Sequence, residues 1–175
     1  LFRSNLDEFF QVRVAGLRKQ VAARYQDPAA DGLTAEEQLT AISTVVRELQ
    51  RHHDRCLMQD VLPALAAAGI ELIVDWNALT EADRAHLARY FTDQVFPVLT
   101  PLAVDPGHPF PTISNLSISL AVTLRGPEGD EHFARVKVPK ILPRWVPLPG
   151  GTRFVPLETL ISAHLEALFP GIEIL

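Results

Sequence analysis

The chain has 175 residues and a formal net charge of −5, with 47% apolar and 21% charged residues. This composition is that of a globular protein with enough apolar material to form a core. The acidic balance argues against a dedicated binder of nucleic acid or anionic membrane, because such binding needs a basic face. A single cysteine, Cys56, excludes an intramolecular disulfide and a cysteine-based metal cluster. No apolar run approaches the ~20 residues of a membrane-spanning helix.

The first predicted helix runs over about residues 6–25. Its apolar residues recur at helical spacing and form one face, made of Leu6, Phe9, Phe10, Val14, Leu17 and Val21. Ser4 or Asn5 is placed to be its N-cap. The pairs Asp27-Pro28 and Asp31-Gly32 then predict a loop. Because the chain opens at Leu1 directly into this helix, and its last residues read as the start of a strand, we expect it to be a piece of a longer protein.

A second, longer helix is predicted to begin at Thr34, with Glu37 completing a capping box. Its apolar seam steps by three and four, as in a coiled coil, through Leu39, Ile42, Val46, Leu49, His53 and Cys56. We therefore expect Cys56 to be a buried, inert thiol. Pro63 predicts a kink or a break in this helix, and Gly69 predicts its end.

A third helix is predicted to begin at Thr80, with Asp83 in the reciprocal capping position. The three helices together predict a small antiparallel bundle. Near residues 97–106 the composition changes, and prolines and β-branched residues replace Ala, Leu, Glu and Arg. We therefore expect a helical N-terminal domain over residues 1–99 and a second domain over residues 100–175.

The second half reads as a mixture of strands and helix. Residues 117–124 and 132–138 alternate polar and apolar side chains on either side of a Gly- and Pro-rich turn, which predicts a β-hairpin. Residues 154–155 predict a further short strand, and residues 156–168 have one apolar helical face. The predicted class is α+β: an antiparallel helical bundle followed by a mixed α/β domain with an antiparallel hairpin.

Catalytic signatures of the P-loop, dinucleotide-binding, zincin and nucleophile-elbow types do not occur in the sequence. The segment from Asn5 to Phe10 combines polar and aromatic residues. It reads either as a capped helix start or as a ligand contact in which the amide of Asn5 binds the edge of a purine. His108, in the proline-rich segment 105–111, reads either as part of a structured connector or as a phosphoryl acceptor, although no base or metal site accompanies it.

A local basic run consists of Arg135, Lys137, Lys140 and Arg144. On a strand, Arg135 and Lys137 share one face, while Ala134, Val136 and Val138 share the other. One interpretation is the solvated face of an edge strand, where positive charge discourages aggregation. The other is a polyanion contact made by Arg135 and Lys137.

Several segments, in order, resemble the first family of bacterial polyphosphate kinases. Residues 4–10 (SNLDEFF) and 12–17 (VRVAGL) resemble the family's opening, and residues 95–106 (VFPVLTPLAVDP) resemble the entry to its second domain. Residues 108–111, 113–117, 134–139 and 144–148 continue the resemblance. It covers nearly the whole chain and identifies an N-terminal helical domain plus part of the family's head domain.

The resemblance implies an enzyme that reversibly transfers the terminal phosphate of ATP to polyphosphate, with magnesium and through a phosphohistidine. The phosphohistidine and the magnesium ligands belong to the C-terminal half of the family, so no catalytic or metal-binding residue is expected here. Asn5 matches the family's ATP-binding asparagine. The head domain implies a homodimer or homotetramer, and the family implies a cytoplasmic protein whose parent associates with the membrane.

Two other functions stay open at this point. The chain could be a non-catalytic assembly module built from the same domains. It could also be a complete small hydrolase, although the sequence offers no nucleophile with a base or a metal for such a reaction.

Overall fold

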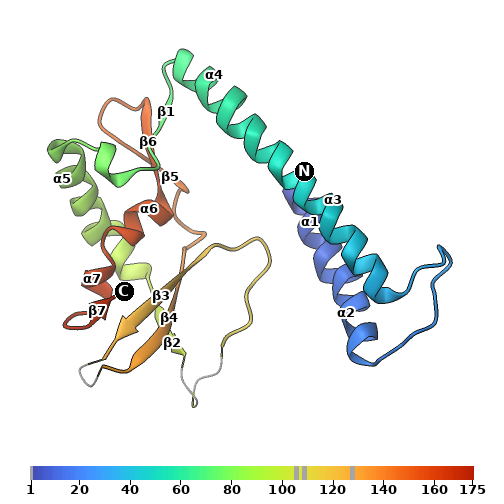
Figure 1. Ribbon diagram of the computed structural model, residues 1–175. Helices are drawn as coiled ribbons and strands as arrows, with labels where there is room; N and C mark the ends of the chain where they lie inside the picture. Colours follow the sequence, from blue (N-terminus) through green and yellow to red (C-terminus); the bar gives the residue numbers. More distant parts are fainter. Residues whose placement is uncertain (1, 105–106, 108–109, 127–128) are drawn as a thin grey trace. The chain divides into compact units, whose positions relative to one another are not determined.

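The computed structural model describes residues 2–104, 107, 110–126 and 129–175, so His108 lies outside the described residues. The chain forms two compact units, residues 1–63 (unit 1) and residues 64–175 (unit 2), both drawn in Figure 1. The change in composition had predicted a division at residues 99 and 100 instead. The structure places the third predicted helix in unit 2, because its apolar face joins the core of that unit.

Unit 1 begins with one helical segment in three parts: α1 (Phe2–Phe9), the π-helical turn η1 (Phe10–Val14) and α2 (Ala15–Ala22). The segment starts before Ser4 and Asn5, so the prediction that one of them is the N-cap is wrong. Asn5 lies inside α1, where its backbone is already helical. Its side chain is therefore not needed to cap the helix.

The second helix of unit 1, α3 (Ala35–Cys56), begins where the sequence predicted. The backbone N–H of Glu37 donates to Oγ1 of Thr34 at 3.4 Å, and the backbone N–H of Thr34 donates to Oε2 of Glu37 at 2.8 Å. The Glu37 carboxylate also accepts from the hydroxyl of Thr34 at 2.8 Å, and the bonds that it accepts from the Thr34 backbone N–H and then from this hydroxyl lower its pKa. The predicted capping box is thus confirmed.

The apolar seam of α3 is only partly covered. Val46 is buried, but Leu49 is 42% exposed and Cys56 is exposed. The prediction of a buried Cys56 thiol is therefore wrong. The reason is one of length: α3 packs against α2, and the 8 residues of α2 cannot cover all 22 residues of α3.

Unit 2 contains two small sheets. The strands are β1 (Glu71–Leu72), β2 (Pro101–Val104), β3 (Ser119–Arg125), β4 (Glu131–Lys137), β5 (Trp145–Pro147), β6 (Arg153–Pro156) and β7 (Glu173–Ile174). A mixed sheet has the order β1-β6-β5, and an antiparallel sheet has the order β2-β4-β3-β7. The predicted hairpin is confirmed as β3 and β4, which pair from Ser119 opposite Lys137 to Arg125 opposite Glu131.

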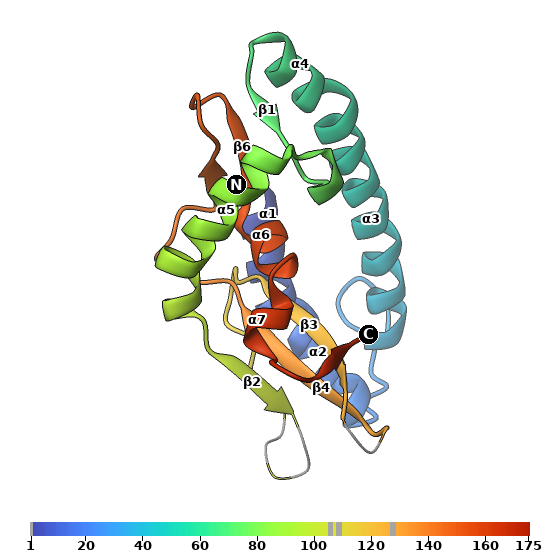
Figure 2. The same cartoon turned by 90° about the vertical axis from the view of Figure 1, so that its left-hand side faces the viewer.

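The helices of unit 2 are α5 (Glu81–Tyr90), α6 (Leu157–Ser162) and α7 (Leu165–Leu168), and they lie on one side of the antiparallel sheet (Figure 2). Their apolar faces and the facing strands form a single core. Fully buried members include Leu87, Val136, Leu157, Leu160 and Ile161. The predicted α+β class, with antiparallel helices before an antiparallel hairpin, is confirmed.

Prolines account for two irregular helical turns. Before Pro63, which lies in α4 (Leu62–Ala67), the helix widens to the π-helical turn η2 (Leu57–Val61). Before Pro97, which lies in the 3-10 turn η5 (Phe96–Val98), it widens to η4 (Phe91–Val95). A proline removes a backbone donor and crowds the preceding turn, so the widening follows from the sequence. The expected disturbance at Pro63 is a π-helical turn.

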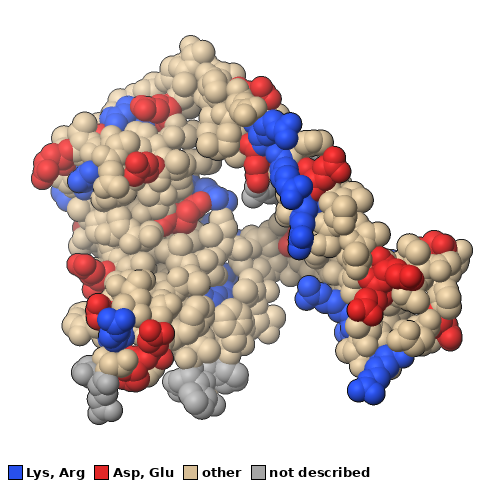
Figure 3. All heavy atoms as spheres, viewed as in Figure 1, with Lys and Arg blue, Asp and Glu red and all other residues tan. Residues whose placement is uncertain are grey.

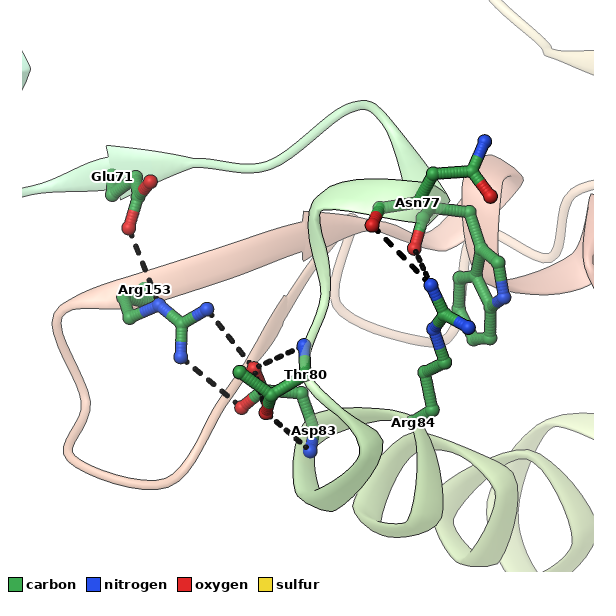
Figure 4. A network of polar contacts seen from close by, with 7 residues as sticks. Glu71, Asn77, Thr80, Asp83, Arg84 and Arg153 are labelled. Carbon is green, nitrogen blue, oxygen red and sulfur yellow. Dashed lines mark hydrogen bonds and ion pairs between the residues drawn. The ribbon is translucent and has the colours of Figure 1, made fainter.

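An arginine connects three elements of unit 2 (Figure 4). Arg153 on β6 binds both carboxylate oxygens of Asp83 at 3.1 and 3.0 Å, and its Nε donates to Glu71 on β1 at 3.2 Å. Asp83 also accepts from the hydroxyl and the backbone N–H of Thr80, at 2.7 and 3.1 Å, in the predicted capping box of α5. Hydrogen bonds from Thr80 and then Arg153 lower the pKa of Asp83, and Asp83 raises the pKa of Arg153.

Candidate functional site

Asn5 lies on the exposed surface of α1. Within the described part of the chain, no hydrogen bond to its side chain is found. One helical turn further on, and therefore on the same side of the helix, the ring of Phe9 is 38% exposed. A free amide beside an exposed aromatic ring can bind the edge of a nucleobase while the ring contacts its face. This is the chemistry that the sequence predicted for Asn5, with Phe9 as an addition that sequence reasoning missed.

The helix around this position is irregular. The π-helical turn η1 (Phe10–Val14) directly follows α1, and the first proline after it is Pro28, well beyond the end of α2. The cause that explains η2 and η4 is therefore absent. Single π-helical turns are frequent at functional sites, because they re-aim side chains on neighbouring turns. The position of η1 thus adds a second structural mark to the Asn5 segment.

A groove of about 270 Å³ lies between the first helical segment of unit 1 and α3. Its wall includes Phe10, Val14 and Val46, together with the basic side chains of Arg18 and Arg47. Asn5 does not line it. Arg135 and Lys137 belong to unit 2, so the three residues predicted as ligand contacts are divided between the two units.

The basic residues of β4 differ in burial. Arg135 is 5% exposed and donates from Nε to Oγ of Ser119 at 3.0 Å, whereas Lys137 is exposed. On the opposite face, Ala134 and Val136 are fully buried, as the alternation predicted. However, β4 lies between β2 and β3 in its sheet. The interpretation of Arg135 and Lys137 as charges on an edge strand is therefore wrong.

Two further groups near Lys137 were not identified from the sequence as parts of a site. Ser114 accepts a hydrogen bond from Nζ of Lys137 at 3.4 Å, and the backbone carbonyl of Asn115 accepts one from Nζ of Lys140 at 3.1 Å. Lys140 was visible as a member of the basic run. A serine and a main-chain carbonyl carry no such signal in one sequence, because only the fold brings residues 114–117 beside the end of β4.

Two histidines of the described residues, His164 and His53, contact neighbouring side chains or the backbone. His164 stacks on Phe91 at 4.5 Å between ring centroids, meets Trp76 edge to face at 5.4 Å, and donates from Nδ1 to the carbonyl of Leu160 at 2.9 Å. His53 contacts the carboxylate of Asp54. No cluster of three His, Cys, Asp or Glu side chains that could hold a metal ion is found in residues 2–104, 107, 110–126 and 129–175.

Charges of both signs are distributed over the surface that Figure 3 shows, and neither unit presents a face of one sign there. This agrees with the small negative net charge of the chain, −5. On this face, an anion site would therefore be a local arrangement of a few cations. A search of the described helices for one that is long and apolar enough to cross a bilayer finds none.

Two family models together match nearly all of the chain, in sequence order. Residues 1–73 match the polyphosphate kinase N-terminal domain, and residues 82–175 match the polyphosphate kinase middle domain. The fold resembles the crystal structure of polyphosphate kinase from Porphyromonas gingivalis, with a TM-score of 0.80 and 30% sequence identity over 99% of this chain. The match covers 26% of that structure's chain.

Curated relatives agree with the structural comparison. The polyphosphate kinase of Streptomyces coelicolor is 53% identical across the whole of this chain, and that of Mycolicibacterium gilvum is 50% identical across 99% of it. These matches occupy 23% and 25% of the two relatives, so the chain spans about a quarter of their length. From the order of the two domain matches, the shared fold and these identities, the chain belongs to the polyphosphate kinase family.

Proposed function

We propose that this chain is the N-terminal portion of an enzyme that reversibly transfers the terminal phosphate of ATP to polyphosphate. The observation that carries the proposal is the ordered match of two consecutive polyphosphate kinase domains along the chain. The phosphohistidine and the Mg²⁺ ligands would lie outside residues 1–175. The chain by itself is therefore expected to be inactive, and it would act from the cytoplasm as part of its parent enzyme.

In this proposal Asn5 contacts the nucleotide base of ATP. Its exposure, its position within α1 and the neighbouring ring of Phe9 all support such a role. An amide can donate to and accept from adenine at once, which a hydroxyl or a carboxylate at neutral pH does less well. Because the base does not react, the contact is expected to serve binding more than the chemical step.

The experiment replaces Asn5 in the full-length enzyme and follows ATP-dependent polyphosphate formation. Asn5→Ala should raise the KM for ATP about two- to tenfold, the range of one lost neutral hydrogen bond, and leave kcat nearly unchanged. Its melting temperature should not fall, because alanine is a better helix former than asparagine inside α1. Gln20→Ala removes another exposed amide from the same helical segment and should leave the KM unchanged.

Two results would contradict this assignment. An Asn5→Ala enzyme with an unchanged KM and a lowered melting temperature would give Asn5 a structural role only. A wild-type parent that forms no polyphosphate from ATP would contradict the function as a whole and favour a non-catalytic assembly module. A homodimer or homotetramer formed through residues 100–175 belongs to the same proposal, and light scattering of the parent tests it.

A further inference from the structure

The lysines of unit 2 converge on one turn. The chain has three lysines, and two of them, Lys137 and Lys140, donate hydrogen bonds to residues of the segment 114–117. Both side chains are exposed, and both partners are neutral oxygens. Among the described residues no carboxylate lies within ion-pair distance of either ammonium group. Within the described part of the chain, the two positive charges are therefore held in place without a carboxylate beside them.

The turn itself is held in an unusual conformation. Leu116 has a φ of +49°, in the left-handed region that residues with a side chain rarely adopt. The hydroxyl of Ser117 donates to the carbonyl of Ser114 at 2.5 Å and closes the turn. Strained backbone of this kind persists where the surroundings fix it, and it is frequent at binding sites. Here the two lysine contacts and the Ser117 hydroxyl provide the fixing.

Arg135 adds a third positive charge, two residues before Lys137 on the same face of β4. The register of the hairpin puts Ser119 opposite Lys137, and Ser119 is also the hydrogen-bond acceptor for Nε of Arg135. Arg135 is 5% exposed, and no carboxylate of the described residues pairs with it. Buried charges are usually paired, because burial without a counter-ion is unfavourable. An anion at this face would supply a negative charge that no carboxylate of the described residues provides.

We propose that Lys137, Lys140 and the turn of residues 114–117 form a binding site, called the seat below, for phosphoryl groups of a linear phosphate chain. The buried charge of Arg135 adds to the positive potential of this site. Ammonium groups bind phosphate oxygens as point charges, and the hydroxyl of Ser114 can donate to the same oxygens. The seat holds substrate at a distance from the reacting phosphate and takes no part in the transfer. The ligand class rests on the proposed function.

The test uses the full-length enzyme and fluorescently labelled linear polyphosphate, with binding followed by anisotropy in the absence of nucleotide. Lys137→Gln and Lys140→Gln should each weaken binding about two- to fivefold, as expected for exposed charge contacts, and the double variant about tenfold. The loss should shrink at high salt, because screening weakens these contacts in the wild type. Lys137→Arg keeps the charge and should retain most of the affinity.

The matched control is the double variant Lys19→Gln/Arg89→Gln, which removes the same charge from exposed positions on α2 and α5. It should bind polyphosphate like the wild type. Equal weakening by this control would overturn the seat in favour of a general charge effect, and unchanged binding by Lys137→Gln/Lys140→Gln would overturn it directly. Equal affinity of the wild type for a single-stranded RNA of similar charge would overturn the phosphate-chain assignment.

The seat and the proposed function can fail separately. If the wild-type enzyme makes polyphosphate while the lysine variants bind it normally, only the seat is wrong. If the enzyme binds polyphosphate through these lysines but makes none from ATP, the seat stands and the proposed reaction is wrong. Ser114→Ala, which keeps both charges and removes one hydroxyl, should weaken binding less than either lysine variant does.

Discussion

Units 1 and 2 bury their apolar side chains to different extents. Unit 2 has its own core, in which α5 and α6 pack on two sheets and residues such as Leu87 and Leu160 are fully buried. Unit 1 is a pair of helical segments with few buried apolar residues, Val14, Leu17, Ala35 and Val46. Exposed apolar side chains such as Val12 and Met58 remain on its surface, at 71% and 61% exposure.

The difference explains where each unit carries its candidate site. In unit 1 the candidate is an exposed helix surface, on which the Asn5 side chain has no hydrogen bond among the described residues and the Phe9 ring meets that of Phe10 edge to face. In unit 2 the candidate is a turn that the lysines, a hydroxyl and the adjoining sheet hold in one conformation. A rigid sheet can position a preformed anion site, whereas a thin helical pair suits a wall that a ligand or a partner surface completes.

The largest loss of stability is expected from a substitution in the core of unit 2. Leu160→Ala should lower the free energy of unfolding of this unit by about 2–5 kcal/mol, because it leaves a cavity among fully buried neighbours. Both tryptophans, Trp76 and Trp145, lie in unit 2, so their fluorescence during urea denaturation reports its unfolding selectively. Helical circular dichroism reports both units.

The matched change in unit 1 is Leu49→Ala on α3, where the side chain is 42% exposed. It should cost about 1 kcal/mol or less and leave the tryptophan transition unmoved. Equal effects of Leu49→Ala and Leu160→Ala on both signals would show that the two units unfold as one cooperative body, and the contrast drawn between them would then be wrong.

A second, smaller effect is expected in the pH dependence of the stability of unit 2. Asp83 has its pKa lowered by Thr80 and Arg153, so its ionised form stabilises unit 2 above the ordinary carboxyl pKa of about 4. This stabilisation should be lost as the pH falls from about 4 through the lower folded-state pKa. Asp83→Asn should therefore lower the urea midpoint of unit 2, measured by tryptophan fluorescence, at pH 7. The midpoint of this variant should also decrease less than that of the wild type when the pH is lowered.

The corresponding carboxyl in unit 1 is Glu37, whose pKa is lowered by Thr34 alone. Glu37→Gln should leave the acid dependence of the tryptophan signal unchanged and act only on the helical signal. If Asp83→Asn showed the same acid dependence as the wild type, the contacts of Asp83 with Arg153 and Thr80 would contribute nothing to the stability of unit 2.

Local chemistry in the sequence predicted much of this fold. Both capping boxes, at Thr34 and Thr80, were predicted because each needs only residues four positions apart or fewer. The hairpin of β3 and β4 followed from alternation and a turn. The fate of the third helix was not predictable in this way, because its apolar face fits a bundle and a sheet equally well. In the structure, this helix packs into the core of unit 2 with the sheets.

The candidate sites divide along the same line. Asn5 was found through a resemblance over a short segment, while its place inside α1 was missed because the helix begins earlier than its apolar pattern. Arg135 and Lys137 were found as a basic run, but their meaning depended on the strand order, which puts β4 inside the sheet. Strand order is a long-range property, and no periodicity within residues 131–137 contains it.

The smallest change tests the exposed end of α3. Cys56 is the only cysteine, and the structure exposes it, so a thiol reagent should modify it under native conditions at nearly the rate seen in denaturant. Modification should leave the tryptophan-detected stability of unit 2 unchanged, since Cys56 lies in unit 1. A thiol that reacts only after unfolding would mean that the seam of α3 is covered along its whole length. Unit 1 would then bury its apolar surface much as unit 2 does, and the difference between the units would be one of size alone.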